Sequence, residues 1–271
     1  MGSLYICGTP IGNLEDSTFR LKSVLSKVDL ILCEDTRRAK KLIEFLQITT
    51  PYESFFVGNE HKKNSEIINK IKKGEDIALI SDAGMPTISD PGASLVQIAG
   101  NEGIDVVVIP GPSSVVAALS LSGFIFTEFT FFGFLKKKGS ERIEQINQIV
   151  RAKRPSIFFT SPLRLKKDLQ AILDQGGIQE ITICRELTKI HETVYRGDAS
   201  SLINDIEDKD LKGEVTVIVN SAIDEIISDD KLIEAASILI KEGTDKRRVA
   251  KALSKVSQFS VNEIYSMIKN F

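Results

Sequence analysis

The chain has few of the residues that usually build metal centres and disulfides. Its 271 residues include two histidines, three cysteines and no tryptophan. The cysteines lie far apart in apolar runs, and no pair has the spacing of metal ligands, which favours buried thiols in a reducing compartment. This pattern argues against a zinc site. We therefore expect no resident metal ion.

Long apolar runs and a strong net charge are also missing. Proline, glycine or charged residues break each apolar run well short of the roughly 20 residues that a membrane span needs. No basic segment of a signal peptide precedes the first apolar run, so we expect a cytoplasmic protein. The formal net charge is −2, which by itself predicts neither nucleic-acid nor membrane binding. With 42% hydrophobic residues, a chain of this length can form about two domains.

Strands and helices alternate in the first part of the chain. Short apolar runs at 4–7, 30–33, 77–80 and 106–109 each lead into a loop and then into a segment with helical periodicity, such as the helix expected at 64–73. Strands that are apolar throughout and separated by helices indicate a parallel sheet covered on both faces. Ligands bind at the carboxyl ends of such strands, where the glycine-rich loops of this chain fall.

The second part of the chain predicts a mixed sheet. Strand-like runs follow one another from about residue 126, and residues 182–197 have the close spacing of a hairpin. Helices are expected near 140–152 and 163–175. After residue 226 the pattern is helical, and "SVNE" at 260–263 is a capping box. The expected fold is α/β, with two α/β domains at 1–120 and 121–223 and a small, helix-turn-helix-like domain at 224–271.

Three glycine-rich loops, at 8–13, 81–92 and 110–114, predict a ligand cleft. None has the P-loop pattern or its lysine, and G-x-G-x-x-G is absent. Asp82 and Asp90 would repel a di- or triphosphate without Mg²⁺, but they suit ribose hydroxyls or a cationic centre. A sulfonium cofactor has both features, and its carboxylate could bind N–H groups where the third loop opens a helix. The residues thus favour S-adenosylmethionine over a nucleoside triphosphate.

Seven motifs in order support a family resemblance: "TPIGNLED", "EDTRRAKKL", "ISDAGMPTISDPG", "PGPSS", "FFGFL", "RELTKIHE" and "GEVTVIV". The chain resembles the tetrapyrrole methylase superfamily and, within it, the bacterial small-subunit ribosomal RNA cytidine 2′-O-methyltransferases. "EDTR", "RELTK" and the helical tail distinguish that branch from the precorrin and uroporphyrinogen methyltransferases. The resemblance implies S-adenosylmethionine in a cleft between two α/β domains, a homodimer, and ribosomal RNA or a ribosomal subunit as partner. Lysines replace an expected proline after "GFL", which leaves the shape of that loop open.

The resemblance also implies a set of cofactor contacts. Asp82, Ala83, Gly84 and Met85 would contact the ribose and methionine parts, and Ser113 and Ser114 would hold the cofactor from the next loop. The remaining positions are Pro10, at the border of the cofactor, and Leu163, Leu187 and Thr216, on the adenine side. Leu163 rests on the loosest of these motif matches.

Methylation of a ribose 2′-hydroxyl by in-line displacement needs a base or strong positioning, because this hydroxyl is a poor nucleophile. The candidate catalytic residues are Glu34, Asp35, Glu186 and Lys189. The first two could instead be the cap and acidic first turn of a helix, and the last two part of a solvated ion-pair cluster. The sequence does not single out one base.

Basic clusters at 37–41, 136–138, 164–167 and 246–248 could contact RNA phosphates if they converge around the cleft. Arg37, Arg38, Lys246, Arg247 and Arg248 are the candidate RNA-binding residues. Each cluster could equally be a solvated face. Two other functions stay open: a tetrapyrrole C-methyltransferase, against which "EDTR" and the tail weigh, and a ribosome-assembly module that binds RNA without catalysis.

Overall fold

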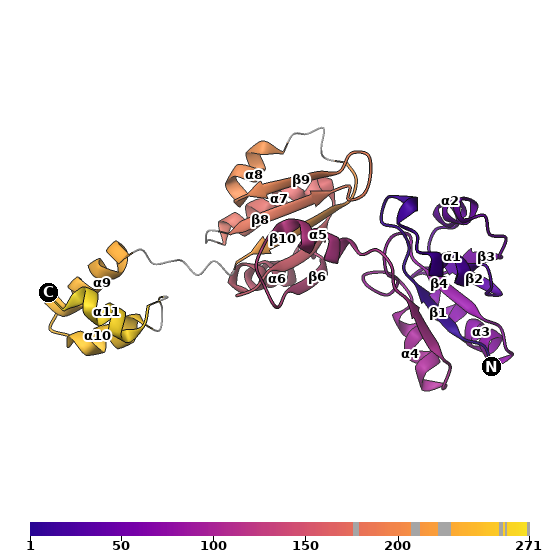
Figure 1. Ribbon diagram of the computed structural model, residues 1–271, viewed down its shortest axis with the longest axis horizontal. Coiled ribbons are helices and arrows are strands. Elements are labelled where there is room, and N and C mark those ends of the chain that lie inside the picture. The colour runs from indigo at the N-terminus through magenta and orange to yellow at the C-terminus, as the bar shows by residue number, and fades with distance from the viewer. Residues whose placement is uncertain (176–178, 207–211, 222–228, 255–256, 258, 270–271) are drawn as a thin grey trace.

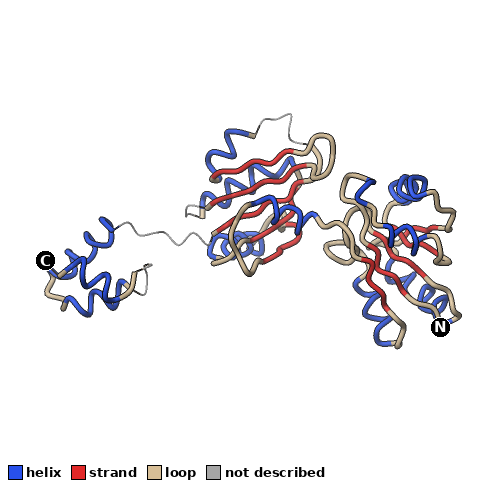
Figure 2. Tube along the Cα trace, in the orientation of Figure 1, coloured by secondary structure: helices blue, strands red, loops and turns tan. Residues whose placement is uncertain are grey.

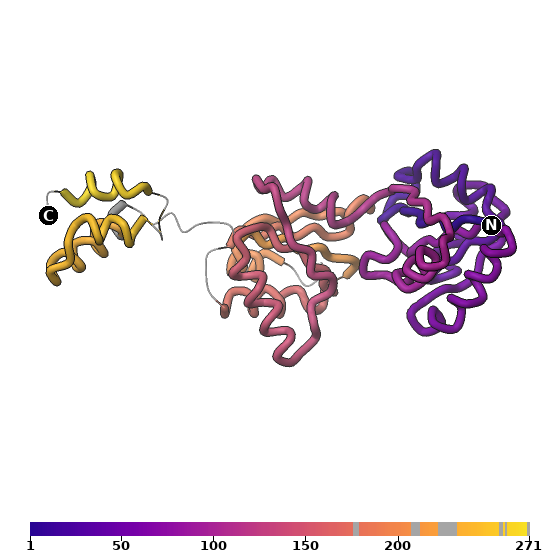
Figure 3. Tube along the Cα trace, turned by 90° about the horizontal axis from the view of Figure 1, so that it is seen from below, coloured from indigo at the N-terminus to yellow at the C-terminus, as the bar shows by residue number. Residues whose placement is uncertain are grey.

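Three units follow one another along the molecule. The computed structural model describes residues 1–175, 179–206, 212–221, 229–254, 257 and 259–269. Figure 1 shows a first sheet, a second sheet and a group of C-terminal helices in a row, and the view from below shows the same order (Figure 3). The predicted architecture of a parallel sheet, a mixed sheet and C-terminal helices is confirmed.

The first sheet is parallel and has the strand order β3-β2-β4-β1-β5. Figure 2 shows its strands in red with helices beside them. Its strands are β1 (Leu4–Cys7), β2 (Leu30–Cys33), β3 (Tyr52–Ser54), β4 (Ile77–Ile80) and β5 (Val106–Ile109). β4 is buried along its whole length, as expected of a strand covered on both faces. β3 was not predicted, because this half-buried edge strand of three residues has no apolar run.

Four helices and a short 3₁₀ turn, Leu14–Asp16, connect these strands: α1 (Phe19–Leu25), α2 (Thr36–Leu46), α3 (Glu60–Lys72) and α4 (Ala93–Asn101). The helix expected at 64–73 begins four residues earlier, at Glu60. The preceding residue, Asn59, accepts a hydrogen bond from the Phe56 N–H and closes the turn there. The first turn of α3 is polar and has no apolar periodicity, so the start of this helix could not be predicted from the sequence.

The second sheet is mixed and has the order β6-β7-β10-β8-β9. Its strands are β6 (Thr130–Phe134), β7 (Ser156–Thr160), β8 (Glu180–Arg185), β9 (Thr193–Gly197) and β10 (Val215–Asn220). β6 and β7 are parallel, and the other pairs are antiparallel. The predicted hairpin is the pair β8–β9.

Helices α6 (Ser140–Arg151) and α7 (Pro162–Asp174) lie close to their predicted positions. The short helix α8 (Ala199–Asp205) was not predicted. Its start is set by Asp198, whose carboxylate accepts hydrogen bonds from the N–H groups of Ser200 and Ser201. α8 packs beside α7 on the second sheet.

Helix α5 (Ser114–Ser122) joins the two sheets. It follows the loop after β5 of the first sheet, yet Val115, Ala118 and Leu119 pack in one apolar cluster with Ile157 and Ile218 of the second sheet. The predicted domain boundary at residue 120 falls inside this helix and stays a prediction. The packing makes α5 a fixed connection between the two halves.

The C-terminal unit consists of α9 (Asp229–Lys241), α10 (Lys246–Leu253) and α11 (Val261–Ile268). These helices enclose their own apolar cluster, which includes Leu232, Val249 and Ile264. The predicted capping box is confirmed by reciprocal hydrogen bonds between Ser260 and Glu263. The predicted start of this domain, at residue 224, lies outside the described residues. Within the described ranges, no helix is long and apolar enough to cross a membrane.

Candidate functional site

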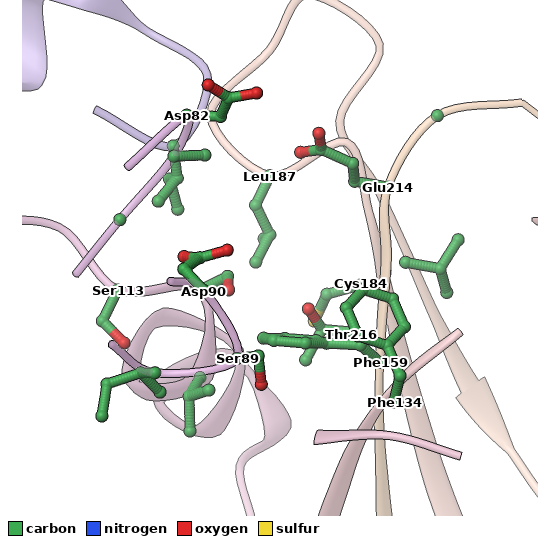
Figure 4. Close-up of a pocket in the computed structure, with 18 of the residues that line it drawn as sticks. Asp82, Ser89, Asp90, Ser113, Phe134, Phe159, Cys184, Leu187, Glu214 and Thr216 are labelled. Atoms are coloured by element: carbon green, nitrogen blue, oxygen red, sulfur yellow. The ribbon is translucent and has the colours of Figure 1, made fainter. Parts of the chain in front are cut away.

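A cleft of about 540 Å³ lies between the two sheets. The first sheet contributes the loops that follow β2, β4 and β5, and the second contributes residues on and beside β7, β8 and β10. Figure 4 shows the two groups of side chains facing each other, with Leu187 between them. The structure thus brings one cleft to the carboxyl ends of the parallel strands, where such sheets bind ligands.

The glycines of the first-sheet loops permit close backbone contacts. Gly84, with φ +82°, exchanges backbone hydrogen bonds of 2.9 and 3.1 Å with Thr9. A Cβ on Gly8 would lie 2.7 Å from the backbone nitrogen of Gly111. These contacts lock the three predicted loops together. Ala83 and Met85 line the cleft beside Gly84.

Four carboxylates line the cleft: Glu34, Asp82, Asp90 and Glu214. Burial, and then the charges of the other three, raises the pKa of Asp90 to about 6. Burial and the nearby Asp82 also raise the pKa of Glu34. Arg38 lies between two of the carboxylates, with its Nε 3.5 Å from Asp82 and its Nη1 3.7 Å from Glu214. The crowded negative charge favours a cationic ligand and disfavours a polyphosphate.

The second sheet lines the cleft through the faces of its strands. Thr216 on β10 pairs in register with Phe159 on β7 and Cys184 on β8, so these three side chains share one face. Glu214 lies two residues before Thr216. Because side chains alternate between the two faces of a strand, it shares the face of Thr216. The motif resemblance pointed to Thr216 and Leu187. It did not point to Phe159, Cys184 or Glu214, whose positions depend on strand register and on the alternation of side chains. Further lining residues that it missed include Ile11, Ser89, Phe134, Thr160, Ser161 and Pro162.

The two sides of the cleft touch through Gly12. A Cβ on this glycine would lie 2.6 Å from side-chain atoms of Lys189 and Thr188 and 2.7 Å from the carbonyl oxygen of Leu187. The loop that it meets contains Glu186 and Thr188 at positive φ, 53° and 65°. Such strained conformations are maintained only where surrounding contacts fix them. The loop that carries Leu187 is therefore fixed partly by the first sheet.

The predicted catalytic residues occupy different surroundings. Glu34 lines the cleft. Asp35 caps α2 and pairs with Arg37 at 2.6 Å, and their hydrogen bonds hold the pKa of Asp35 well below its usual range. Lys189 bonds Glu186 at 2.7 Å and Glu214 at 3.2 Å. Asp35, Glu186 and Lys189 thus have the cap and ion-pair contacts that the sequence allowed as alternatives.

Ion pairing opposes burial in the Glu186–Lys189 pair. Burial favours neutral Glu186, but hydrogen bonds from Lys189 and the Glu214 N–H outweigh it, so the pKa of Glu186 is lowered. Burial likewise favours neutral Lys189, but Glu186 and Glu214 raise its pKa. Both groups are therefore charged at neutral pH. A charged pair of this kind is poorly suited to proton transfer.

The predicted cofactor contacts mostly converge. Eight line the cleft: Asp82, Ala83, Gly84, Met85, Ser113, Ser114, Leu187 and Thr216. Pro10 lines a separate cavity of about 60 Å³ that also borders Asp82. Leu163 is 83% exposed, while the adjacent Pro162 lines the cleft. Leu163 therefore lies beside the cleft in the first turn of α7, and its contact with the cofactor stays a prediction.

The predicted RNA contacts do not converge on one surface. Arg38 lines the cleft and Arg37 is exposed at the start of α2, but Lys246, Arg247 and Arg248 lie on α10 in the C-terminal unit (Figure 1). Lys246 donates a hydrogen bond of 2.8 Å to the Lys269 carbonyl. The Arg247 guanidinium lies 6.0 Å from the centre of the Tyr265 ring. No group of three or more His, Cys, Asp or Glu side chains in the described part of the chain could hold a metal ion.

Comparison with known proteins identifies the family. Residues 3–203 match the Tetrapyrrole (Corrin/Porphyrin) Methylases. Among curated proteins, the chain is similar to "Ribosomal RNA small subunit methyltransferase I" of Thermotoga maritima, with 44% identity over 81% of this chain and 99% of the relative. The Synechocystis protein of the same name is 37% identical over 98% of this chain and 97% of the relative. The Vibrio cholerae protein of that name is 39% identical over 97% and 92%.

Solved structures show the same fold at much lower identity. A cobalt precorrin-4 methyltransferase aligns with a TM-score of 0.62 and 17% identity over 81% of this chain and 95% of that one. A uroporphyrin-III C-methyltransferase from Thermus thermophilus, complexed with S-adenosyl homocysteine, has a TM-score of 0.57 and 15% identity over 82% and 99%. These findings agree with S-adenosylmethionine as the predicted cofactor. Its sequence over residues 3–203 and its two sheets place the chain in the tetrapyrrole (corrin/porphyrin) methylase family.

Proposed function

We propose that the chain is an S-adenosylmethionine-dependent methyltransferase that methylates the 2′-oxygen of a cytidine in small-subunit ribosomal RNA. The observation that carries the proposal is the acidic cleft, in which, among the described residues, four carboxylates and Arg38 form the charged lining and Arg38 pairs with two of them. The relatives named as small-subunit ribosomal RNA methyltransferases, at 37–44% identity, support the RNA substrate. The specific cytidine and the 2′-oxygen come from the motif resemblance.

The chemistry of the cleft fits this cofactor. Asp82 and Asp90 supply negative charge for a sulfonium centre and acceptors for ribose hydroxyls. Ser113 and Ser114 lie where α5 begins, and N–H groups at a helix N-terminus favour a carboxylate. Leu187 and Thr216 offer an apolar and polar wall for adenine. S-adenosylmethionine supplies an electrophilic methyl group on a positively charged sulfur.

Glu34 is the residue that we assign as proton acceptor. It is half-buried in the cleft, and its pKa is raised by burial and by Asp82. A carboxylate whose pKa moves toward neutrality accepts a proton from a hydroxyl more effectively than an ordinary one. Asp35 is held in its cap and in an ion pair, and Glu186 and Lys189 bond each other. Glu34 therefore fits the role best among the four candidates.

A tetrapyrrole C-methyltransferase is the alternative function within the same fold. The precorrin and uroporphyrin enzymes align at 15–17% identity, which shows the fold alone. The relatives at 37–44% identity are all named for ribosomal RNA. A cytoplasmic location, a ribosomal RNA or subunit partner and a homodimer belong to the proposal as expectations that follow from that substrate and from the motif resemblance.

The proposal is tested by methyl transfer in vitro. Small ribosomal subunits and their naked RNA, both from a strain lacking this enzyme, are incubated with methyl-labelled S-adenosylmethionine. Mass spectrometry of the nucleosides should find label in 2′-O-methylcytidine, and mass spectrometry of nuclease fragments should place it at one position. Label in another nucleoside would refute the cytidine 2′-oxygen. Transfer to a corrinoid or porphyrin precursor supplied in a parallel assay, but not to RNA, would establish the alternative. Binding of RNA and cofactor without any transfer would indicate an assembly module.

A further inference from the structure

Strand β6 contains an extra residue beside the cleft. Phe131 pairs with Ile157 and Phe134 pairs with Phe159, so three steps along β6 match two steps along β7. Gly133, at φ +63°, lies within this bulge. An extra residue in a strand sends the following side chains to the opposite face of the sheet. The bulge thus decides where the side chain of Phe134 points.

The redirected side chain lies at the edge of the cleft. In a regular strand, Phe134 would share a face with Phe132, which packs on the inner core of the second sheet. Instead it joins Phe131 beside Phe159, with ring centroids 5.3 Å and 5.0 Å from the Phe159 ring. Phe134 is nevertheless 61% exposed and lines the cleft (Figure 4). The bulge therefore presents a large aromatic ring to solvent at a ligand site.

The segment after Phe134 is held in place by two arginines. Arg164 donates hydrogen bonds of 3.3 and 3.0 Å to the carbonyls of Leu135 and Lys136. Arg142 donates to the same Lys136 carbonyl at 3.3 Å and pairs at 2.7 Å with Asp168, which is fully buried. A ring on a strand end fixed in this way loses little conformational entropy when it stacks on a ligand.

Positive charge accompanies the exposed ring. Lys136, at the end of the fixed segment, and the next two residues, Lys137 and Lys138, are exposed, and Lys136 pairs with Glu141 at 3.4 Å. Leu163, 83% exposed, is in the first turn of α7, whose Arg164 binds this segment. The cleft rim is defined here as Phe134, Lys136, Lys137, Lys138 and Leu163. It combines an aromatic platform with cations, and its Phe134 lines the cleft on the side of the second sheet.

We propose that the cleft rim binds single-stranded RNA, with a base of that RNA stacked on Phe134 and its phosphates near the three lysines. Exposed aromatic rings beside basic side chains bind single strands, because each base has a face that can stack while cations attract the backbone. The inference rests on the proposed function and deepens it: the rim positions the target strand at the mouth of the cleft. Phe134 is a positioning residue in this proposal.

The first experiment measures RNA binding without cofactor, by fluorescence anisotropy of a labelled, unstructured oligoribonucleotide. Phe134→Ala should weaken binding about 5- to 150-fold, the range measured for loss of one stacked base. Phe134→Trp should restore it, and Phe134→Leu should restore less, because a planar ring is needed. Calorimetry should give the same S-adenosylmethionine affinity for all variants. This pattern distinguishes stacking from general damage to the fold.

The lysines are tested through the salt dependence of the same binding. The triple variant K136A/K137A/K138A should reduce the slope of log affinity against log salt by up to about 2, at about 0.7 for each single-strand phosphate contact. The matched control K27A/K72A/K73A removes the same charge near the amino ends of β2 and β4, away from the cleft. It should leave the slope within error of the wild type.

Several results would refute the proposal that the cleft rim binds RNA. RNA affinity of Phe134→Ala within twofold of the wild type would refute the platform, and a weaker S-adenosylmethionine affinity would assign Phe134 to the cofactor. Equal slopes for the two triple variants would refute the lysine contacts. If Phe134→Ala binds and methylates RNA as well as the wild-type protein does, the proposed role of the cleft rim is wrong while the proposed function stands. If the wild-type protein binds cofactor but no RNA, the proposed function itself fails.

Discussion

The two sides of the cleft differ in how the chain builds them. The first sheet contributes loops at the ends of parallel strands, where glycines such as Gly84 allow close contacts and Asp82 and Asp90 supply charge. The second sheet contributes side chains on the faces of strands, such as Phe159 and Thr216. A loop site has a sequence motif that can be recognised. A strand-face site depends on register, which a single sequence does not display.

The difference also concerns charge. Three of the four cleft carboxylates come from the first-sheet side, and Glu214 alone comes from the second. The aromatic rings of Phe134 and Phe159 both belong to the second sheet. The charged first-sheet side of the cleft therefore faces a second-sheet side that carries the aromatic rings. Variants on the two sides should change different quantities, and this expectation can be tested.

The largest effect should come from Glu34→Gln on the first-sheet side. If Glu34 accepts the 2′-hydroxyl proton, the rate of methyl transfer should fall about 10²- to 10⁴-fold, while S-adenosylmethionine affinity changes little. Single-turnover assays with labelled cofactor measure the rate. The wild-type rate should decrease as pH falls through the raised pKa of Glu34, because the base must be ionised.

The control for this variant is Glu102→Gln, which removes an exposed carboxylate paired with Lys72 at 2.8 Å after α4. Exposed pairs of this kind contribute little, so its rate should equal that of the wild type. A Glu34→Gln rate within threefold of the wild type would show that the proton leaves by another route.

Asp82→Ala should have the next largest effect, on cofactor affinity. Loss of a charged hydrogen bond costs about 1.5–3 kcal/mol, or roughly 10- to 150-fold in the dissociation constant. The Asp82 carboxylate also accepts the Asp35 N–H at 3.0 Å, so the alanine variant should melt at a lower temperature as well. Asp82→Asn keeps an acceptor for that N–H and should recover the melting temperature but not the affinity. Calorimetry that finds wild-type affinity in both variants would remove Asp82 from the cofactor site.

Some strands and helices of the fold could be predicted from the sequence, and others could not. The strand β4 and the loop after it could be predicted, because an apolar run, two glycines and two carboxylates lie within a short segment. The edge strand β3 and the helix α8 could not, because both are short and lack a strong apolar period. Their positions depend on tertiary contacts, which override weak local preferences.

The site residues that lie in loop motifs could be predicted, and those placed by strand register could not. Ser113 lies in a motif at a strand end, "PGPSS", from which a ligand contact could be predicted, and the structure places it on the cleft wall. Phe134 belongs to the motif "FFGFL", but its orientation depends on one extra residue in β6. Strand alternation alone would have assigned it to the core face. Glu214 becomes predictable only once the register of Thr216 is known.

Gly12→Ala tests whether the two sides depend on each other. The new Cβ would meet the Leu187 carbonyl at 2.7 Å, and backbone atoms cannot move away freely. The variant should therefore displace the loop of the second sheet, costing about 0.5–3 kcal/mol of stability and weakening cofactor binding through Leu187. Chemical denaturation and calorimetry measure these two effects.

The matched substitution is Gly100→Ala inside α4, where a Cβ meets nothing within 4 Å. It should stabilise the protein by about 0.5–1 kcal/mol, because glycine is a poor helix residue. Cofactor affinity should not change in this control. If Gly12→Ala behaves like Gly100→Ala, the contact between the two sides has no energetic importance.

Asp90→Asn should produce a smaller, pH-dependent effect on stability. Because the folded pKa of Asp90, about 6, exceeds its unfolded value, its ionisation costs stability as pH rises through 6. Without solvent screening, a pKa shift of this size would correspond to about 3 kcal/mol of folding free energy. Solvent around half-buried Asp90 reduces this cost to the order of 1 kcal/mol. The variant should melt above the wild type at pH 8 and equally at pH 4. An equal difference at both pH values would exclude titration of Asp90 as the cause.

The smallest effect should come from the C-terminal unit, which is far from both sides of the cleft in Figure 1. Lys246 already donates to the Lys269 carbonyl, and Arg247 lies over Tyr265. The triple alanine variant of Lys246, Arg247 and Arg248 should therefore lower the salt slope of RNA binding by about 0.7 if Arg248 alone contacts a phosphate, and by no more than about 2. Cofactor affinity should be unchanged, because the unit packs around its own core. A slope change larger than that of the cleft-rim lysines, measured with the same RNA, would make the C-terminal helices the main RNA contact and reverse this order.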